Sequence, residues 1–233
     1  MADRVKTKIR LDKFISSQTK LSRSDAVKAV YHHKVQVNGR TASDPAMKVD
    51  ISLDEILLSG EKLTYEQYVY YVLNKPAGVI SATEDKEHKT VIDLLPKDIP
   101  LFPVGRLDID TEGLIVLTND GKFAHDLTSP KHHVDKTYFA KLDGNVTDEM
   151  VKAFAEGFDY GEEKPSLPGK LESIDESSAY VTIHEGKFHQ VKRMFKTFDR
   201  EVLYLQRVGF GKLRLDENLK TGEYKKISKD DIV

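Results

Sequence analysis

Beyond Tyr68, β-rich runs and helical segments follow one another without regular alternation. The β-rich runs are 68–73, 113–118, 137–142, 179–183 and 202–205, and the helical patterns are 122–127, 147–157 and 188–198. A doubly wound parallel sheet needs a helix between successive strands, so this order favours an α+β domain. We expect a mixed, mostly antiparallel sheet with flanking helices. The sequence contains no Walker loop and no dinucleotide-binding glycine motif.

The segment 1–59 has a different pattern and predicts a small separate domain. Apolar residues recur with helical spacing at 11, 14 and 15, and again at 26, 27, 30 and 31. Val35 and Val37 alternate with polar residues, and Asn38-Gly39 is typical of a tight hairpin turn. We therefore expect two helices and a hairpin at 1–59, a polar linker at 60–67 and a second domain at 68–233.

Charge separates the two parts of the chain. The net charge is −2, but residues 1–50 contain 11 Lys and Arg against 5 Asp, an excess of +6, which leaves −8 for residues 51–233. A basic segment of this kind is typical of a surface that binds a polyanion, because Lys and Arg neutralise phosphates and release counterions. A solvated basic face has the same composition, so charge alone leaves both interpretations open.

Other features exclude several classes of protein. The chain has no cysteine, which excludes disulfides, a thiolate nucleophile and cysteine-ligated metals. The pairs His32-His33 and His132-His133 lack the spacing of a shared metal site, so we expect no metal. No apolar run is long enough to span a membrane, and the polar start contains no hydrophobic signal segment. We expect a cytoplasmic protein without membrane contact.

Two segments of the second domain carry candidate chemistry. Residues 104–113 place three carboxylates and one arginine between apolar strands, which suits either a catalytic loop or a turn whose Asp residues accept backbone hydrogen bonds. In the predicted helix 188–198, one stripe is apolar and the other side is cationic. This cationic side contains His189, Lys192, Arg193 and Lys196 and suits either phosphate or carboxylate binding, or plain solvation.

Three stretches of the first domain resemble the alpha-L RNA-binding domain, the type named after small-subunit ribosomal protein S-four. They are Arg10-Leu11-Asp12-Lys13-Phe14, Ser22-Arg23-Ser24-Asp25-Ala26 and Val35-Gln36-Val37-Asn38-Gly39. The resemblance covers about residues 8–50. It implies an RNA contact surface on the second helix and the following turn, formed by Arg23, Lys28, Lys34 and Arg40.

Four stretches of the second domain resemble, in order, the motifs of the pseudouridine synthases. They are 74–78, 105–108, 136–138 and 186–193. The longer stretches 105–114 and 128–133, together with the leading alpha-L domain, are similar to the RsuA branch, which modifies small-subunit ribosomal RNA. The resemblance extends over nearly the whole chain.

This resemblance implies a role for individual residues. Asp108 matches the nucleophile, Tyr138 the active-site tyrosine and Lys192 the basic partner of Asp108, whereas Asp110 and Glu112 are interpreted as neighbours that shape the loop. Five further positions are implied to contact or support the substrate: Lys75 at the floor of the site, Arg106 at a phosphate, Leu205 near the target base, His189 and Arg193.

The implied reaction joins the sugar to carbon five of uracil in place of nitrogen one, so it needs no cofactor. The aspartate either attacks the anomeric carbon or assists proton removal through a glycal-like intermediate, and both roles need an ionised carboxylate. The expected partner is 16S ribosomal RNA, free or in a small-subunit assembly intermediate, and we expect a monomer. Two alternatives remain: the same chemistry on large-subunit 23S ribosomal RNA, or a non-catalytic RNA-binding ribosome assembly factor.

Overall fold

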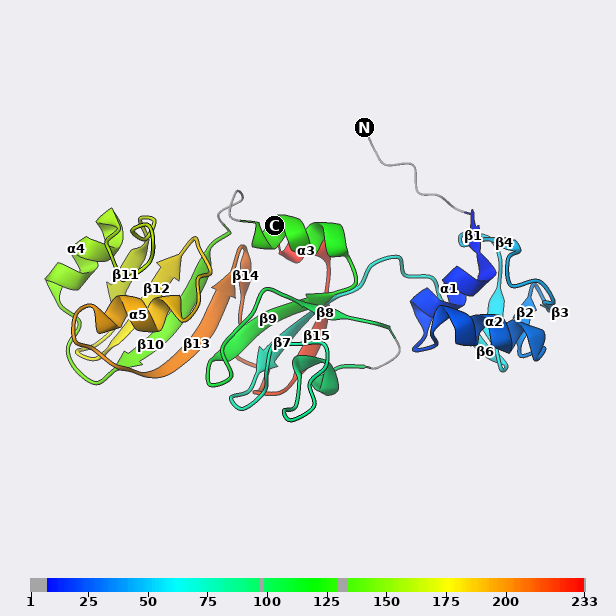
Figure 1. The fold of residues 1–233 in the computed structure, drawn as a ribbon, viewed down its shortest axis with the longest axis horizontal. Helices are drawn as coiled ribbons and strands as arrows, with labels where there is room; N and C mark the ends of the chain where they lie inside the picture. Colours follow the sequence, from blue (N-terminus) through cyan, green and yellow to red (C-terminus); the bar gives the residue numbers. More distant parts are fainter. Residues whose placement is uncertain (1–7, 97–98, 130–133, 233) are drawn as a thin grey trace, which may run out of the picture. The chain divides into compact units, whose positions relative to one another are not determined.

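The structure is a computed structural model of the chain and describes residues 8–96, 99–129 and 134–232. The chain divides into two compact units (Figure 1), of which the first contains residues 8–68 and the second contains 69–95 and 101–232. In these described parts, no helix has the length and apolar character needed to cross a membrane.

The first unit combines two helices with short strands. In order, the elements are β1 Lys8–Arg10, α1 Leu11–Gln18, α2 Arg23–Tyr31, β2 Val35–Val37, β3 Arg40–Thr41, β4 Lys48–Asp50, β5 Ile56–Leu58 and β6 Glu61–Leu63. Strands β3, β2, β5 and β6 form an antiparallel sheet in that order, and β1 pairs with β4. The predicted two helices and hairpin are confirmed.

Local sequence explains these elements. The apolar residues of α1 and α2 pack with Val35, Val37 and Ile56 in one buried core. The Ser22 hydroxyl accepts a hydrogen bond from the backbone of Asp25 and so caps the start of α2. At the tip of the β2–β3 hairpin, Asn38 and Gly39 both have positive φ, 51° and 74°, as the two-residue turn requires.

The predicted linker at 60–67 is largely part of the first unit. Residues 61–63 form β6, which pairs with β5, and the ring of Tyr65 stacks on Phe14 at 5.8 Å. The Gln18 side chain makes two hydrogen bonds with the backbone of Glu66. The polar composition of this segment reflects an exposed edge strand and not a free connection.

The second unit is built on one large sheet. Its elements are β7 Tyr70–Lys75, the 3-10 helix η1 Val91–Leu94, β8 Phe102–Val104, β9 Glu112–Thr118, α3 Gly121–Thr128, β10 Lys136–Leu142, α4 Asp148–Glu156, β11 Lys170–Ser173, β12 Ser178–Ile183, α5 Gln190–Lys196, β13 Val202–Phe210, β14 Leu213–Arg214, β15 Tyr224–Ile227 and the 3-10 helix η2 Lys229–Asp231. The sheet order is β11-β12-β10-β13-β9-β7-β15, with β14 paired to β13 and β8 paired to β9.

This sheet confirms the predicted α+β class. All its pairings are antiparallel except β9 with β13, which is parallel. The five predicted strands and three predicted helices are present with shifted ends. The helix predicted at 188–198 is shorter, because His189 has a left-handed backbone conformation and α5 begins only at Gln190.

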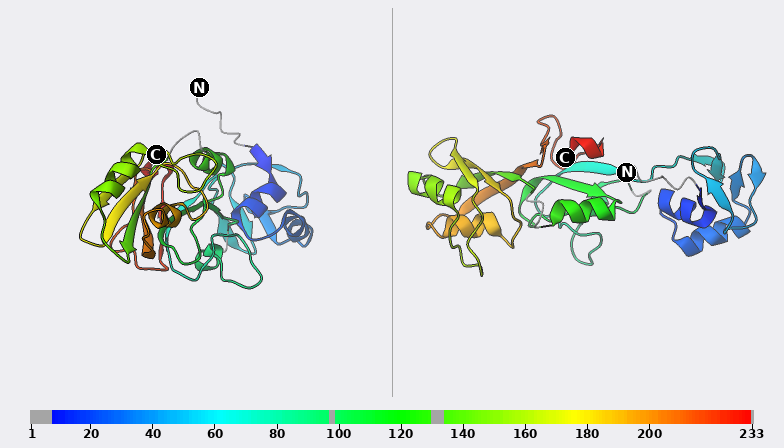
Figure 2. Two further views of the ribbon diagram at one scale, coloured as in Figure 1. Left: turned by 60° about the vertical axis from the view of Figure 1, so that its left-hand side comes forward. Right: turned by 90° about the horizontal axis from the view of Figure 1, so that it is seen from above.

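The parallel contact between β9 and β13 lies next to the loop 105–111, which precedes β9. Gly113 faces Arg207 across this contact, and a Cβ atom at position 113 would lie 2.3 Å from the Arg207 carbonyl oxygen. Only glycine therefore allows the two strands to approach here. Figures 1 and 2 show α4 and α5 beside the end of the sheet formed by β10, β11 and β12.

Candidate active site

The loop 105–111 connects β8 to β9, and hydrogen bonds from a buried lysine fix its backbone. The Lys75 ammonium at the end of β7 donates to the carbonyl oxygens of Pro76 at 3.1 Å, Ile109 at 3.3 Å and Thr111 at 2.8 Å. Burial lowers the pKa of Lys75 to about 8, against the attraction of the nearby carboxylates. Lys75 is fully buried and supports the loop, and its predicted contribution to substrate binding stays a prediction.

A second set of hydrogen bonds fixes the loop beside Asp108. The buried Ser81 hydroxyl donates to the carbonyl oxygen of Leu107 at 2.9 Å and accepts from its N–H at 3.0 Å. The N–H of Thr111 donates to the carbonyl oxygen of Asp108 at 3.1 Å. The backbone on both sides of Asp108 is therefore fixed, while its carboxylate stays partly exposed.

Two basic side chains from the start of α5, an imidazole and an ammonium, face the Asp108 carboxylate. Nε2 of His189 lies 3.5 Å from one carboxylate oxygen, and Nζ of Lys192 lies 3.8 Å from the other. His189 is the residue before the first turn of α5 and Lys192 is three positions later, so both side chains emerge on one side of the helix. Helix α5 thus brings positive charge to the predicted nucleophile.

The shortest contacts of Lys192 are with Asp110 and not with Asp108. Its ammonium lies 2.6 and 2.7 Å from the two carboxylate oxygens of Asp110. This hydrogen bond is the main cause that lowers the pKa of Asp110. Asp110, interpreted from the sequence as a neighbour that shapes the loop, is therefore the principal ion-pair partner of Lys192, and Asp108 is the more distant one.

The sheet places Tyr138 and Leu205 on one face. Tyr138 on β10 is opposite Arg207 on β13, and Leu205 lies two residues before Arg207. Arg207 is in turn opposite Gly113, near the start of β9 and just after the loop 105–111. Strand β13, which carries Leu205, is thus paired with β9, and β10, which carries Tyr138, is paired with β13. Both side chains are largely buried.

The sequence analysis missed Arg207, which is opposite both Tyr138 and Gly113. Its side chain is almost fully buried, its Nε donates to the carbonyl oxygen of Leu114 at 2.7 Å, and its guanidinium lies over the ring of Phe210 at 5.3 Å. An arginine inside a mostly apolar strand was the available signal. The buried guanidinium joins β13 to β9 at the base of the loop.

The remaining predicted substrate-binding arginines differ from each other. Arg106 is exposed and has no side-chain partner within the described ranges, so its guanidinium is available to a phosphate. Arg193 instead forms an ion pair with Glu162, donates to the Gly161 carbonyl oxygen at 2.6 Å and lies over the Tyr160 ring. Arg193 therefore holds the segment 160–162, and its predicted substrate contact stays a prediction.

The predicted RNA-binding residues of the first unit also fall into two pairs. Arg23 forms an ion pair with Asp12 at 3.3 Å, and Lys28 forms one with Asp25 at 2.9 Å. Lys34 and Arg40 are exposed, and their side chains have no partner among the residues that the structure describes. These last two are the freely available cations of the set.

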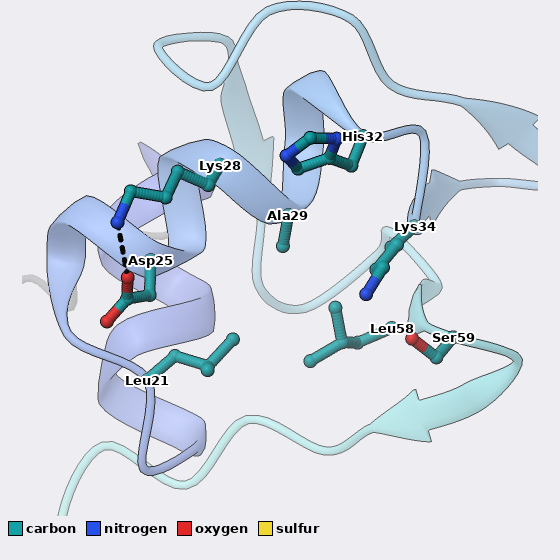
Figure 3. Close-up of a pocket in the computed structure, with 8 residues that line it drawn as sticks. All are labelled: Leu21, Asp25, Lys28, Ala29, His32, Lys34, Leu58 and Ser59. Atoms are coloured by element: carbon teal, nitrogen blue, oxygen red, sulfur yellow. Dashed lines mark hydrogen bonds and ion pairs between the residues drawn. The ribbon is translucent and has the colours of Figure 1, made fainter.

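Lys28 and Lys34 line one hollow on the surface of the first unit (Figure 3). The hollow has a volume of about 330 Å³ and lies between α2 and the end of β5. Figure 3 shows Lys28 turned toward Asp25, whereas the ammonium of Lys34 points into the hollow. Arg23 and Arg40 do not line it. The structure thus brings together two of the four predicted residues.

No cluster of three or more His, Asp or Glu side chains is arranged to hold a metal ion in residues 8–96, 99–129 and 134–232. Of the stretch 128–133, which supported the resemblance to the RsuA branch, residues 130–133 lie outside the described residues, as does the pair His132-His133.

Comparisons with known proteins cover both units. The RNA pseudouridylate synthase family matches residues 69–197, and the S4 domain matches residues 9–56. A ribosomal small subunit pseudouridine synthase A of Haemophilus influenzae is 40% identical over 228 residues, 96% of this chain and 98% of that protein. The protein of the same name in Escherichia coli is 37% identical over 228 residues, with coverage of 96% and 98%. A crystal structure of a pseudouridylate synthase matches with a TM-score of 0.68 at 40% identity, covering 96% of this chain and 98% of that one.

Proposed function

This chain belongs to the RNA pseudouridylate synthase family, and we propose that it converts one specific uridine of 16S ribosomal RNA to pseudouridine, with Asp108 as the nucleophile. The family activity is an isomerisation, and the chain carries an RNA-binding S4 domain in front of the catalytic domain. The choice of small-subunit RNA follows the names of the relatives, which span almost the same length as this chain.

The position of Asp108 carries this proposal. Its carboxylate is partly exposed on a loop whose backbone is fixed by Lys75 and Ser81. The His189 imidazole and the Lys192 ammonium face it from α5 at 3.5 and 3.8 Å. A fixed and accessible carboxylate suits attack on the sugar or removal of its proton.

The reaction breaks the bond between the anomeric carbon and nitrogen one, and forms a bond from that carbon to carbon five. Nitrogen one gains a proton and carbon five loses one, so the atoms balance without a cofactor. In our proposal the Tyr138 ring stacks on the detached uracil, and its hydroxyl assists removal of the proton at carbon five. Leu205, two positions from the strand partner of Tyr138, packs against the same base.

The target atom is inaccessible in a stacked strand, so the uridine must leave the stack before it reacts. We assign Arg106, an exposed guanidinium two positions before Asp108, to a phosphate of the extruded nucleotide. The first unit supplies affinity for the surrounding RNA through Lys34 and Arg40. Such backbone contacts orient RNA without reading its sequence.

The substitution Asp108→Asn tests the proposal. Purified wild-type chain is incubated with small-subunit or large-subunit ribosomal RNA, and carbodiimide treatment followed by primer extension locates pseudouridine. We expect one new stop on the small-subunit RNA with the wild type and none with Asp108→Asn. Asp110→Asn is the matched control for loss of a carboxylate on the same loop, and we expect it to retain product formation.

The outcomes separate the parts of the proposal. Circular dichroism and RNA binding must show that Asp108→Asn is folded and binds RNA. Product formation by this variant at the wild-type rate would contradict the role of Asp108. A stop only on the large-subunit RNA would contradict the target, and no product on either RNA would contradict the function.

A further inference from the structure

A large aromatic side chain lies exposed at the mouth of the Asp108 site. Phe188 is 73% exposed, and only Leu53 among the described large hydrophobic residues is more exposed, at 82%. The two belong to different units, and Phe188 precedes helix α5, which carries Lys192. Exposing a phenyl ring to water forgoes the free energy that burial would provide, and this ring adjoins His189, which contacts Asp108.

The turn that presents Phe188 is well defined. The buried Gln190 side chain accepts a hydrogen bond from the N–H of Lys187 at 3.1 Å and donates to Glu185 at 3.0 Å. His189 has a φ of 49°, in the left-handed region that non-glycine residues rarely adopt. This turn reverses the chain just before α5 and directs Phe188 outward. Strained residues of this kind often occur at sites of ligand contact.

Phe188 and His189 form a stack that begins at the catalytic carboxylate. Their rings are 3.8 Å apart and inclined by 18°. Nε2 of His189 lies 3.5 Å from Asp108, so the imidazole is the inner ring and the phenyl group, with the larger exposure, is the outer ring. The stack extends from the nucleophile toward solvent with one open aromatic face.

We propose that Phe188, supported by His189, stacks on the RNA base next to the extruded uridine and fills part of the space that this uridine leaves. The inference rests on the proposed function. Removing a nucleotide from a stack exposes the faces of its neighbours, and an aromatic ring that covers one of these faces recovers stacking free energy. Because every base has a flat π-face, this contact tolerates any neighbouring base and does not select the sequence.

The position of the stack fits this role. The gap left by the extruded uridine must lie near Asp108, which reacts with that uridine. The Phe188 ring is close enough to reach it, because it stacks at 3.8 Å on His189, and His189 lies 3.5 Å from Asp108. Arg106, exposed on the loop that carries Asp108, supplies a cation for a phosphate of the extruded uridine. The extruded nucleotide and the base beside it thus meet different side chains.

The kinetic test compares Phe188→Ala with Phe188→Tyr, which keeps the ring, and with Ile174→Ala. Ile174 is an exposed apolar residue directly after β11 and serves as the control for loss of exposed apolar surface. We expect Phe188→Ala to lower kcat/KM by about tenfold to a hundredfold, the usual range for loss of one aromatic–base stack. Phe188→Tyr and Ile174→Ala should stay within about twofold of the wild type, which is well below one stacking contact.

An RNA substrate with abasic positions on both sides of the target separates stacking from a structural effect. On this RNA the difference in kcat/KM between the wild type and Phe188→Ala should largely disappear. A difference that stays the same on abasic RNA would overturn the proposal, as would Phe188→Ala with wild-type kcat/KM on normal RNA. A wild type without product on normal RNA would contradict the proposed function itself.

Fluorescence gives a second, independent measurement. The chain contains no tryptophan, so Phe188→Trp introduces a single reporter at the proposed contact. We expect its emission to be quenched by normal RNA and to recover when the flanking positions are abasic. Emission that does not change at saturating normal RNA would contradict the proposed stack.

Discussion

Replacing Lys75 by methionine tests whether a buried ammonium fixes the loop 105–111, which carries Asp108. Burial lowers the pKa of Lys75 from 10.5 to about 8 in the folded chain. One pKa unit corresponds to about 1.4 kcal/mol, so the charged form at neutral pH costs about 3 kcal/mol relative to the unfolded chain. This cost is present below the folded pKa and disappears as pH rises from about 8 toward 10.5, because the unfolded chain there binds the proton that the folded chain has lost.

The wild-type free energy of unfolding should therefore include a contribution from Lys75 that rises by about 2 kcal/mol between about pH 7 and about pH 9.5. Lys75→Met lacks this contribution. Lys136, whose pKa burial also lowers to about 8, contributes in both proteins and cancels in the comparison. Urea unfolding at constant ionic strength, followed by circular dichroism over this pH range, measures the difference. The same pH dependence in both proteins would refute the buried charge.

Activity supplies the functional part of this test. Without the ammonium, the carbonyl oxygens of Pro76, Ile109 and Thr111 lose their shared donor, and the loop that carries Asp108 is free to shift. A displacement of about 1 Å in a catalytic group is enough to lower kcat about a hundredfold. We expect a loss of this size in folded Lys75→Met, measured as pseudouridine formed per minute. Wild-type kcat in the folded variant would contradict the supporting role.

Three further predictions concern the loop and the first unit. Gly113→Ala should destabilise the chain by about 3 kcal/mol, because the added Cβ would lie 2.3 Å from a backbone oxygen of β13. The control is Gly78→Ala, where φ is also positive but the added Cβ meets no atom within 4 Å. Urea unfolding should show a cost of only about 1 kcal/mol for this control. Asp110→Asn should let the Lys192 ammonium approach Asp108 more closely than 3.8 Å, because the carboxylate that it contacts at 2.6 Å is lost; a crystal structure of the variant with an unchanged distance from Lys192 to Asp108 would contradict this ion-pair arrangement. Lys34→Ala should reduce the slope of log affinity for RNA against log salt by about one, and filter binding with an unchanged slope would exclude this phosphate contact.

Local patterns predicted most of the helices and the central strands. Helical spacing found α1 and α2, and the β-rich runs found β7, β9, β10, β12 and β13. The strand β15 was missed because Tyr224–Ile227 is short and contains two lysines, and its pairing with β7 joins residues far apart in the sequence. The edge strand β6 was interpreted as a linker for a similar reason, since its Glu61 and Lys62 resemble loop residues.

The candidate site was predictable by residue type and less so by contact. The motifs indicated Asp108, Tyr138 and Lys192, but the division of Lys192 between two carboxylates depends on how α5 meets the loop. Lys75 and Arg193 were assigned to the substrate from their positions in two of the motifs. Burial of one and an ion pair of the other arise from tertiary packing, which no local pattern contains.

The order of the strands has a consequence for synthesis of the chain. The packing of the first unit closes within residues 8–66, so it can fold as soon as this segment has left the ribosome. The large sheet instead joins β7 to β9, β9 to β13 and finally β7 to β15, and its distant pairings must wait for the end of the chain. We expect the nascent chain to acquire its RNA-binding unit well before the loop that carries Asp108 is locked in place.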